Sequence, residues 1–215
     1  MIIYGDSFSS NDNGVSWVDE FSKLSQGTPC VNKAVSGSCF GNYSLYPVIS
    51  NGVDEVINTY NKGENEIILS YGINDVSSII MNYTTLDRVL IDINKCVDHI
   101  LQNNPDCHIS FLFLSENDKV IQEMANKQYE YLSTYFPKGF MDFNVTTWEE
   151  YYNYFYKEII NYFKQYIYIN LIPMYNDCKE YVDNLLPDNM HPNINGAHII
   201  ANRVIEEGNF GTDLG

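Results

Sequence analysis

Residues 66–75 read EIILSYGIND, a short apolar run that passes into a glycine and polar residues. The run from Glu66 to Tyr71 is apolar enough for a strand that is buried on both faces, which is typical of the centre of a parallel sheet. The residues that follow, Gly72 to Asp75, then mark the loop at the carboxyl end of that strand.

Similar apolar runs lie on both sides of this one, and stretches with helical spacing separate them. The expected strands are Ile2–Tyr4, Cys30–Val35, Glu66–Tyr71, His108–Leu114 and Tyr166–Ile172. Apolar residues recur at helical spacing in Gly14–Leu24, Thr85–Leu101, Lys119–Tyr135, Thr147–Lys164 and Gly196 or Ala197 to Glu206. Strands that alternate with helices predict an α/β protein, a three-layer α/β/α sandwich with a central, mainly parallel five-stranded sheet.

The composition fits one packed domain. The chain has 215 residues, of which 45% are hydrophobic and 19% charged, so disordered, collagen-like and coiled-coil proteins are excluded. The length suits a single α/β domain over residues 1–215, because no repeat or Pro/Gly-rich linker divides it. We expect an insertion around residues 136–150, which could wall a cleft.

The aromatic stretch after this insertion reads as a helix with one core face. Its expected core residues follow helical spacing: Trp148, Tyr152, Phe155, Ile159 and Phe163. Tyr151 and Tyr154 fall off this stripe. Exposed tyrosines at these positions would stack on sugars or on partner proteins, but core packing is the favoured interpretation of the aromatic stretch.

The charge balance argues against nucleic acid as a partner. Twelve Lys and Arg stand against 28 Asp and Glu, which gives a net charge of −16. Such a surface repels phosphate backbones. No run of 18 apolar residues is present, so we expect no membrane insertion.

The cysteines and the N-terminal residues bear on location. The five cysteines have no paired metal-ligand spacing and are expected to be reduced and mostly buried: Cys30, Cys39, Cys96, Cys107 and Cys178. The sequence from Met1 to Gly5 lacks the features of a signal peptide. We therefore expect a cytoplasmic protein, or part of a viral or otherwise exported assembly.

Polar residues gather after the predicted strands, and the carboxyl ends of parallel strands meet at one edge of a sheet. Gly5-Asp6-Ser7 follows the first strand, Ser36-Gly37-Ser38 the second and Gly72-Ile73-Asn74-Asp75 the third. Each segment alone is more often a turn or a helix cap. However, a serine at a strand-to-helix turn is exposed, a glycine lets a backbone N–H approach a ligand, and Asn74 offers a side-chain donor.

An aspartate and a histidine stand three residues apart near the C-terminus, in Asp188-Asn189-Met190-His191-Pro192. The carboxylate can orient the imidazole of the same turn. A nucleophilic serine needs such a base, because its hydroxyl is a poor nucleophile at neutral pH. The remaining histidines, His99, His108 and His198, have no such companion and are expected to be structural.

Together and in this order, these blocks resemble the SGNH (GDSL-type) hydrolase family: Gly5-Asp6-Ser7, Gly37, Gly72-x-Asn74-Asp75 and Asp188-x-x-His191. The resemblance spans nearly the whole chain and implies the flavodoxin-like fold of that family. It also implies that Ser7 is the nucleophile, that His191 is the general base and then acid, and that Asp188 holds the imidazole. The backbone N–H groups of Ser7 and Gly37 and the amide of Asn74 would form the oxyanion hole, with no metal and no cofactor.

The expected function is therefore that of a serine hydrolase that cleaves carboxylic esters through an acyl-enzyme. A short-chain or carbohydrate O-acetyl esterase, acting on a small-molecule or carbohydrate ester, fits the acidic chain best. Two alternatives stay open. One is a catalytically idle or weakly active glycan-binding module of a larger assembly, and the other is an acyltransferase that uses the same acyl-enzyme. The sequence leaves the natural ester and the oligomeric state undetermined.

Overall fold

The computed structural model describes residues 1–25, 28–60, 62–136 and 143–208. Its strands are β1 (Ile2–Gly5), β2 (Val31–Asn32), β3 (Glu66–Ser70), β4 (His108–Phe113) and β5 (Ile169–Pro173). They form one sheet in the order β2-β1-β3-β4-β5, and every neighbouring pair is parallel. The predicted α/β class is confirmed, and the sheet is parallel throughout.

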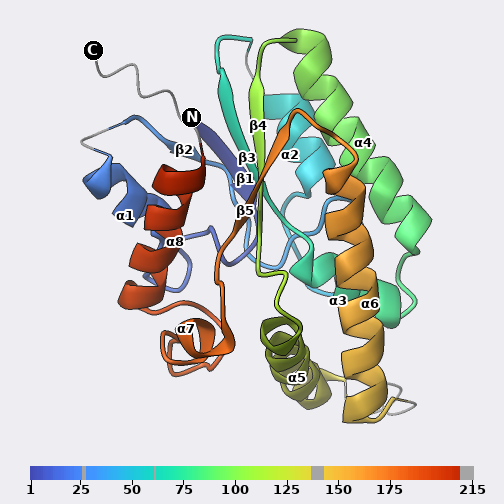
Figure 1. Ribbon diagram of the computed structural model, residues 1–215. Coiled ribbons are helices and arrows are strands. Elements are labelled where there is room, and N and C mark those ends of the chain that lie inside the picture. Colours follow the sequence, from blue (N-terminus) through green and yellow to red (C-terminus); the bar gives the residue numbers. More distant parts are fainter. Residues whose placement is uncertain (26–27, 61, 137–142, 209–215) are drawn as a thin grey trace.

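Helices cover both faces of this sheet. They are α1 (Trp17–Leu24), α2 (Gly52–Thr59), α3 (Ile73–Ile80), α4 (Leu86–Asn103), α5 (Asp118–Tyr135), α6 (Val145–Lys164), α7 (Cys178–Val182) and α8 (Ile194–Glu207). Helices α1 and α8 lie on one face, whereas α2, α4 and α6 lie on the other (Figure 1). Helices α3, α5 and α7 gather at the lower end of this view, beyond the carboxyl ends of the strands. The three layers are therefore those predicted.

The central strand β3 is the most completely buried part of the sheet. Ile67, Ile68 and Leu69 are fully buried, and they pair with β1 on one side and β4 on the other. The apolar run that predicted this strand is thus explained by helices on both faces. The strand ends at Ser70, one residue earlier than predicted.

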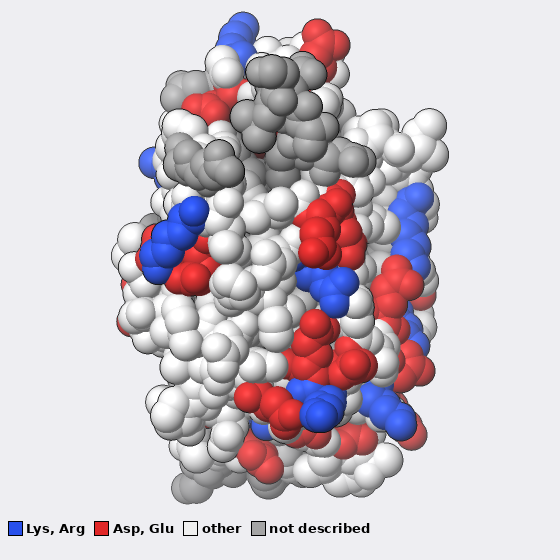
Figure 2. Space-filling view, turned by 60° about the vertical axis from the view of Figure 1, so that its left-hand side comes forward, with Lys and Arg blue, Asp and Glu red and all other residues white. Residues whose placement is uncertain are grey.

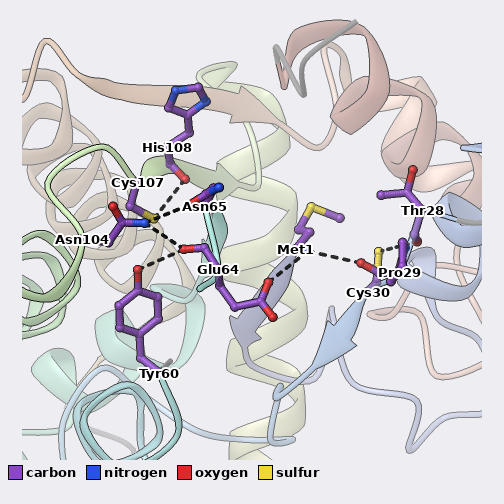
Figure 3. A network of polar contacts seen from close by, with 10 residues as sticks. All are labelled: Met1, Thr28, Pro29, Cys30, Tyr60, Glu64, Asn65, Asn104, Cys107 and His108. Carbon is purple, nitrogen blue, oxygen red and sulfur yellow. Dashed lines mark hydrogen bonds and ion pairs between the residues drawn. The ribbon is translucent and has the colours of Figure 1, made fainter. Parts of the chain in front are cut away.

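A network of polar contacts connects the strands at the opposite, amino end of the sheet (Figure 3). The Glu64 carboxylate lies 3.4 Å from the Met1 nitrogen, and the Glu64 carbonyl accepts a hydrogen bond from the Tyr60 hydroxyl at 3.1 Å. The Asn104 amide donates to this carbonyl and to the Asn65 side chain. These contacts join the segments that lead into β1, β3 and β4. The loops at the carboxyl ends of the strands take no part in them.

The second strand is shorter than predicted and occupies the edge of the sheet. It covers Val31–Asn32 instead of Cys30–Val35, because the Asn32 side chain accepts a hydrogen bond from the Ala34 N–H and turns the chain. The N–H of Val35 still donates to the Gly5 carbonyl at 2.8 Å, so the following loop stays beside the end of β1.

The last strand begins later than predicted, at Ile169 instead of Tyr166. The N–H of Ile169 donates to the Tyr166 carbonyl at 2.9 Å, which closes a turn after α6. Ile167 in this turn is almost fully exposed. Residues 166–168 therefore form a turn, although their apolar and aromatic composition predicted a strand.

Three helices were not predicted, namely α2, α3 and α7. They are short, with eight, eight and five residues, so each gives at most two turns of periodic pattern. Polar residues at or just before their first turns read equally well as loops. The helix α3 matters for the site, because it begins inside the segment that was expected to be a loop after β3.

The aromatic helix α6 is confirmed, but one residue of its core face differs from the prediction. Trp148, Tyr152, Ile159 and Phe163 are buried as predicted, whereas Tyr156 is buried in place of the partly exposed Phe155. Tyr151 and Tyr154, which fall off the predicted stripe, are exposed: 46% and 56% of their surface is accessible, so core packing does not hold for these two residues. The insertion predicted around residues 136–150 lies partly outside the described residues, and from Val145 onward it belongs to α6.

The surface is acidic but mixed. On the face in Figure 2, the described basic side chains lie beside acidic ones instead of forming a patch of their own. In the part of the chain that the structure describes, no helix is long and apolar enough to cross a membrane. All five cysteines fall within the described residues and are free, and three of them are buried.

Replacing Tyr156 with phenylalanine should destabilise the protein. Its hydroxyl accepts a hydrogen bond from the Leu114 N–H at 2.7 Å, just beyond the end of β4. The Tyr156→Phe variant leaves this buried N–H without a partner, which costs about 1–3 kcal/mol in the free energy of unfolding. Urea denaturation measures the change, with the exposed Tyr154→Phe as a control that we expect to stay within about 0.5 kcal/mol of the wild type.

Candidate active site

A tight turn exposes Ser7 directly after β1. The buried Asp6 side chain accepts a hydrogen bond from the Phe8 N–H at 3.0 Å, and the Asp6 N–H donates to the Ser70 carbonyl at 3.0 Å. Asp6 and Phe8 are buried on either side of the partly exposed Ser7. The turn is therefore fixed by its buried neighbours, and the Ser7 hydroxyl faces outward.

The loop before α8 brings His191 to this hydroxyl. Its Nε2 lies 2.9 Å from Ser7 Oγ, although the two residues are 184 positions apart. Its Nδ1 lies 2.7 Å from Asp188 Oδ2. The imidazole ring also packs against the Phe8 ring, with 5.4 Å between the two ring centroids. The three side chains thus form a continuous chain of hydrogen bonds from carboxylate to imidazole to hydroxyl.

Asp188 is held by its own turn. Its Oδ1 accepts hydrogen bonds from the Met190 N–H at 2.9 Å and the His191 N–H at 3.0 Å. Partial burial raises the pKa of Asp188, but the hydrogen bonds from the Met190 N–H and from His191 outweigh it, and the pKa is lower than usual. The carboxylate is therefore ionised at neutral pH, which suits a partner for an imidazolium.

Backbone contacts on both sides fix this loop to the fold. Leu185 and Pro192 form an antiparallel bridge, and the Asn193 N–H donates to the Asn184 carbonyl at 2.8 Å. A Cβ on Gly196 would lie 2.6 Å from the same carbonyl, so only glycine allows this approach. Helix α8, which starts here, packs against α1 and β5. The position of His191 is thus set by the packing of the last helix.

Gly37 lies in the loop after β2 and needs its lack of a side chain. Its φ angle is +76°, in the region that favours glycine, and a Cβ would come within 3.1 Å of the Tyr46 side chain. The Ser44 hydroxyl donates to the Gly37 carbonyl at 2.6 Å, which turns the peptide. Within the described residues, the N–H groups of Gly37 and Ser7 make no hydrogen bond, so both are available to a ligand.

Asn74 lies in the first turn of α3, not in a loop as predicted. Gly72, with φ of +122°, precedes the helix and allows the sharp change of direction after β3. The Asn74 amide donates one hydrogen bond to the Ser38 carbonyl at 3.1 Å, and its side chain also lines the cavity at Ser7. A carboxamide has two N–H donors, so one remains for a ligand.

Asp75 on α3 connects this helix to the loop that follows Gly37 through buried hydrogen bonds. It is fully buried, and its Oδ1 accepts hydrogen bonds from the Phe40 N–H and the Tyr43 hydroxyl, each at 2.9 Å. Burial raises the pKa of Asp75 to about 7, although these hydrogen bonds lower it. Burial likewise raises the pKa of Asp6 to about 7, and the charge of Asp75 contributes to that rise. Two acids that are hard to ionise therefore support the site.

A cavity of about 160 Å³ opens beside Ser7. It is lined by Ser7, Ser36, Gly37, Tyr46, Asn74, Gln128, Tyr131, Met190 and His191. The structure thus brings all the predicted site residues to one place, except that Asp188 lies behind His191. Sequence reasoning missed Tyr46, Gln128, Tyr131 and Met190. A signal existed for Gln128, which is a polar residue on the apolar face of its helix, four positions from both Met124 and Leu132.

The other histidines lie away from this cavity. His198 on α8 lies 3.6 Å from Glu20, His108 at the start of β4 lies 3.1 Å from Glu66, and His99 lies on α4. Over the described residues, no three side chains of the metal-binding types come together.

Comparison with known protein families gives a match over nearly the whole chain. The family model for GDSL-like lipase/acylhydrolase matches residues 2–204. No curated protein matches the sequence.

Several solved structures have a similar fold. TesA is 14% identical, with a TM-score of 0.58 and 97% of each chain covered. A family two carbohydrate esterase from Clostridium thermocellum, in complex with cellohexaose, is 12% identical, with a TM-score of 0.59 over 96% of this chain and 62% of that one. The psychrotrophic esterase EstA from Pseudoalteromonas is also 12% identical, with a TM-score of 0.53 over 96% and 94%. At these identities the likeness concerns the fold alone.

The stability of the protein should fall as the pH rises from about 4 to about 7. Over this range folded Asp75 keeps a proton that the unfolded chain, with a carboxyl pKa near 4, has lost. The Asp75→Asn variant has no such proton, so its free energy of unfolding should fall less steeply, by about 1 kcal/mol per pH unit at most. Urea denaturation at several pH values measures both slopes. If the Asp75→Asn variant and the wild type show the same dependence on pH, the raised pKa of Asp75 is contradicted. The exposed Asp118→Asn variant is the control and should keep the wild-type slope.

Proposed function

Because the chain belongs to the GDSL-like lipase/acylhydrolase family, and is thereby an ester hydrolase, we propose that it cleaves its ester through an acyl-enzyme on Ser7. The observation that carries this proposal is the chain of hydrogen bonds from Asp188 through His191 to Ser7, at 2.7 Å and 2.9 Å. Hydrogen-bonded contact between nucleophile, base and orienting group is the geometry that activates a serine.

The first half of the reaction forms the acyl-enzyme. Ser7 Oγ attacks the ester carbonyl carbon while His191 Nε2 takes the hydroxyl proton, and Asp188 stabilises the imidazolium that results. The tetrahedral intermediate then collapses: the bond to the alcohol oxygen breaks, and His191 gives its proton to the leaving alcohol. In the second half, His191 deprotonates a water that attacks the acyl carbon, and the proton returns to Ser7 as the carboxylic acid leaves.

Three donors surround the place where the carbonyl oxygen gains its negative charge. They are the N–H groups of Ser7 and Gly37, which have no partner among the described residues, and the second N–H of the Asn74 amide. Because these donors are fixed before the ester binds, they stabilise the oxyanion without reorganisation. The buried Asp75 keeps two of them in register, since it joins α3 to the loop that follows Gly37.

The size and lining of the cavity favour a short acyl group on a polar alcohol. At about 160 Å³ it is smaller than the roughly 300–1,000 Å³ that drug-sized ligands occupy. Tyr46 and Tyr131 line it with their ring centroids 6.2 Å apart, and the exposed Tyr135 ring continues from Tyr131 at 4.9 Å. Tyrosines that combine an apolar ring with a hydroxyl suit sugar rings. The proposed substrate is therefore an O-acetylated carbohydrate.

Replacing the Ser7 hydroxyl should abolish turnover without unfolding the protein. We expect Ser7→Ala to lower kcat on p-nitrophenyl acetate by at least about 1000-fold, because the acyl-enzyme cannot form. Ser133→Ala on α5 is the matched control and should retain wild-type turnover. A panel of acyl chain lengths and acetylated sugars then tests the substrate, with acetyl esters expected to react fastest. An inactive wild type that still binds glycans would instead favour the glycan-binding module.

Removing the Asn74 amide should slow the chemical step more than it weakens binding. We expect Asn74→Ala to lower kcat by about 100- to 1000-fold, because one oxyanion donor is lost. The Michaelis constant should change little, since the donor acts on charge that appears only in the transition state. Steady-state kinetics on p-nitrophenyl acetate separate the two constants, and thermal unfolding checks that the fold is kept. A rise in KM with kcat unchanged would place Asn74 in substrate binding instead.

A further inference from the structure

The cavity beside Ser7 holds one buried polar group that the proposed ester cleavage does not use. This is the side chain of Gln128, which projects from α5 and is only 2% exposed. It lines the same cavity as Ser7, Asn74 and His191. A glutamine this deeply buried is uncommon, because its carboxamide loses its hydrogen bonds to water.

The hydrogen bonds of Gln128 are incomplete on the acceptor side. Its Nε2 donates to Met190 Sδ at 3.5 Å, which orients the carboxamide. Among the described residues, its Oε1 has no hydrogen-bond partner. Buried carbonyl oxygens are paired in the great majority of cases, so an unpaired one on a side chain that lines a cavity points to a ligand that supplies the donor.

The position of Gln128 sets it apart from the other unpaired groups of its helix. Asn126 Oδ1 on α5 is also buried and has no partner in the part of the chain that the structure describes, but Asn126 does not line the cavity. Gln122, one and a half turns earlier on the same helix, is exposed to solvent. Only Gln128 therefore combines burial, an unpaired oxygen and access to the site, among the described glutamines and asparagines of α5.

We propose that Gln128 Oε1 accepts a hydrogen bond from a hydroxyl of the alcohol part of the ester, and that the enzyme thereby selects polyol or sugar esters with a free hydroxyl next to the ester. This inference rests on the proposed ester hydrolysis and adds the group that recognises the alcohol. The Tyr46 and Tyr131 rings supply contact area in the same cavity, whereas the hydrogen bond to Gln128 fixes the orientation of the alcohol part of the ester. An ester without the hydroxyl leaves the buried Oε1 without a donor, so it gains no hydrogen bond and binds more weakly.

A matched pair of esters tests the selection. The wild type is assayed with 2-hydroxyethyl acetate and with propyl acetate, which differ by a hydroxyl in place of a methyl group. The same comparison is made between a monoacetylated methyl glucoside and its counterpart with the free hydroxyls methylated. We expect kcat/KM of the wild type to be about tenfold higher for the hydroxyl-bearing member of each pair, as for one net hydrogen bond.

Variants of Gln128 assign this preference to the side chain. Gln128→Met is close in size but has no acceptor oxygen, and it should bring the ratio of the two kcat/KM values close to one. Gln128→Glu keeps an acceptor and should retain part of the preference. Gln122→Met is the matched control on the same helix and should leave the ratio at its wild-type value.

The outcomes separate the two proposals. If Gln128→Met lowers both kcat/KM values equally, or leaves the ratio unchanged, the role of Gln128 is refuted while ester hydrolysis stands. A wild type without preference for the hydroxyl-bearing esters refutes it as well. If the wild type cleaves none of the esters, the proposed function fails, and the inference fails with it.

Discussion

The hydrogen bond between His191 and Ser7 is the contact on which the rest of the site depends. It joins the first loop of the protein to the last, and it exists because α1 and α8 pack together on one face of the sheet. The turn from Asp188 to His191 is held by its own hydrogen bonds, since Asp188 binds the backbone and the imidazole of this turn. Packing of α8 therefore has only to place this unit as a whole. Misplacement by about 1 Å would cost a large part of the rate.

The proposed oxyanion donors depend on a second constraint, which is the burial of two carboxyl groups. Asp75 holds the backbone after Gly37, and Asp6 holds the backbone around Ser7. Burial disfavours their ionised forms and raises both pKa values. The two buried carboxyl groups thus lower the stability of the protein at neutral pH. Their hydrogen bonds, however, fix the loops at the carboxyl ends of β1 and β2. Such unfavourable burial is typical of functional sites.

Different parts of the fold contribute the residues that line the cavity. The groups that we propose to act on the ester carbonyl come from the ends of β1 and β3, from the loop after β2 and from the loop before α8. Groups that face the rest of the substrate come from α5 and from the loop that carries Tyr46. Because the second set lies on elements that can change without disturbing the sheet, selectivity for the alcohol and the cleavage chemistry are structurally separate.

Sequence patterns were sufficient for the parallel sheet, its five strands and the loop positions of Ser7, Gly37 and His191, whereas Asn74 lies in the first turn of α3 and not in the expected loop. These follow from local patterns: apolar runs separated by helical spacing, and polar residues after the strands. Local patterns could not fix where α3 begins, since Gly72 and Asn74 read equally well as a turn. They also could not decide that Tyr156 would be buried in place of Phe155, because neighbouring aromatic residues fit the same helix at slightly different rotations.

The tertiary structure alone decided which side chains share the cavity. Tyr46, Gln128 and Tyr131 come from a loop and a helix that are more than 80 positions apart, and they meet only when α5 packs beyond the end of β4. Neighbouring residues in the sequence predict the secondary structure of each segment, whereas the rotation and placement of a whole helix depend on the entire core. A polar residue such as Gln128 on an apolar face shows that something unusual is present, but only the packed fold shows that it faces Ser7.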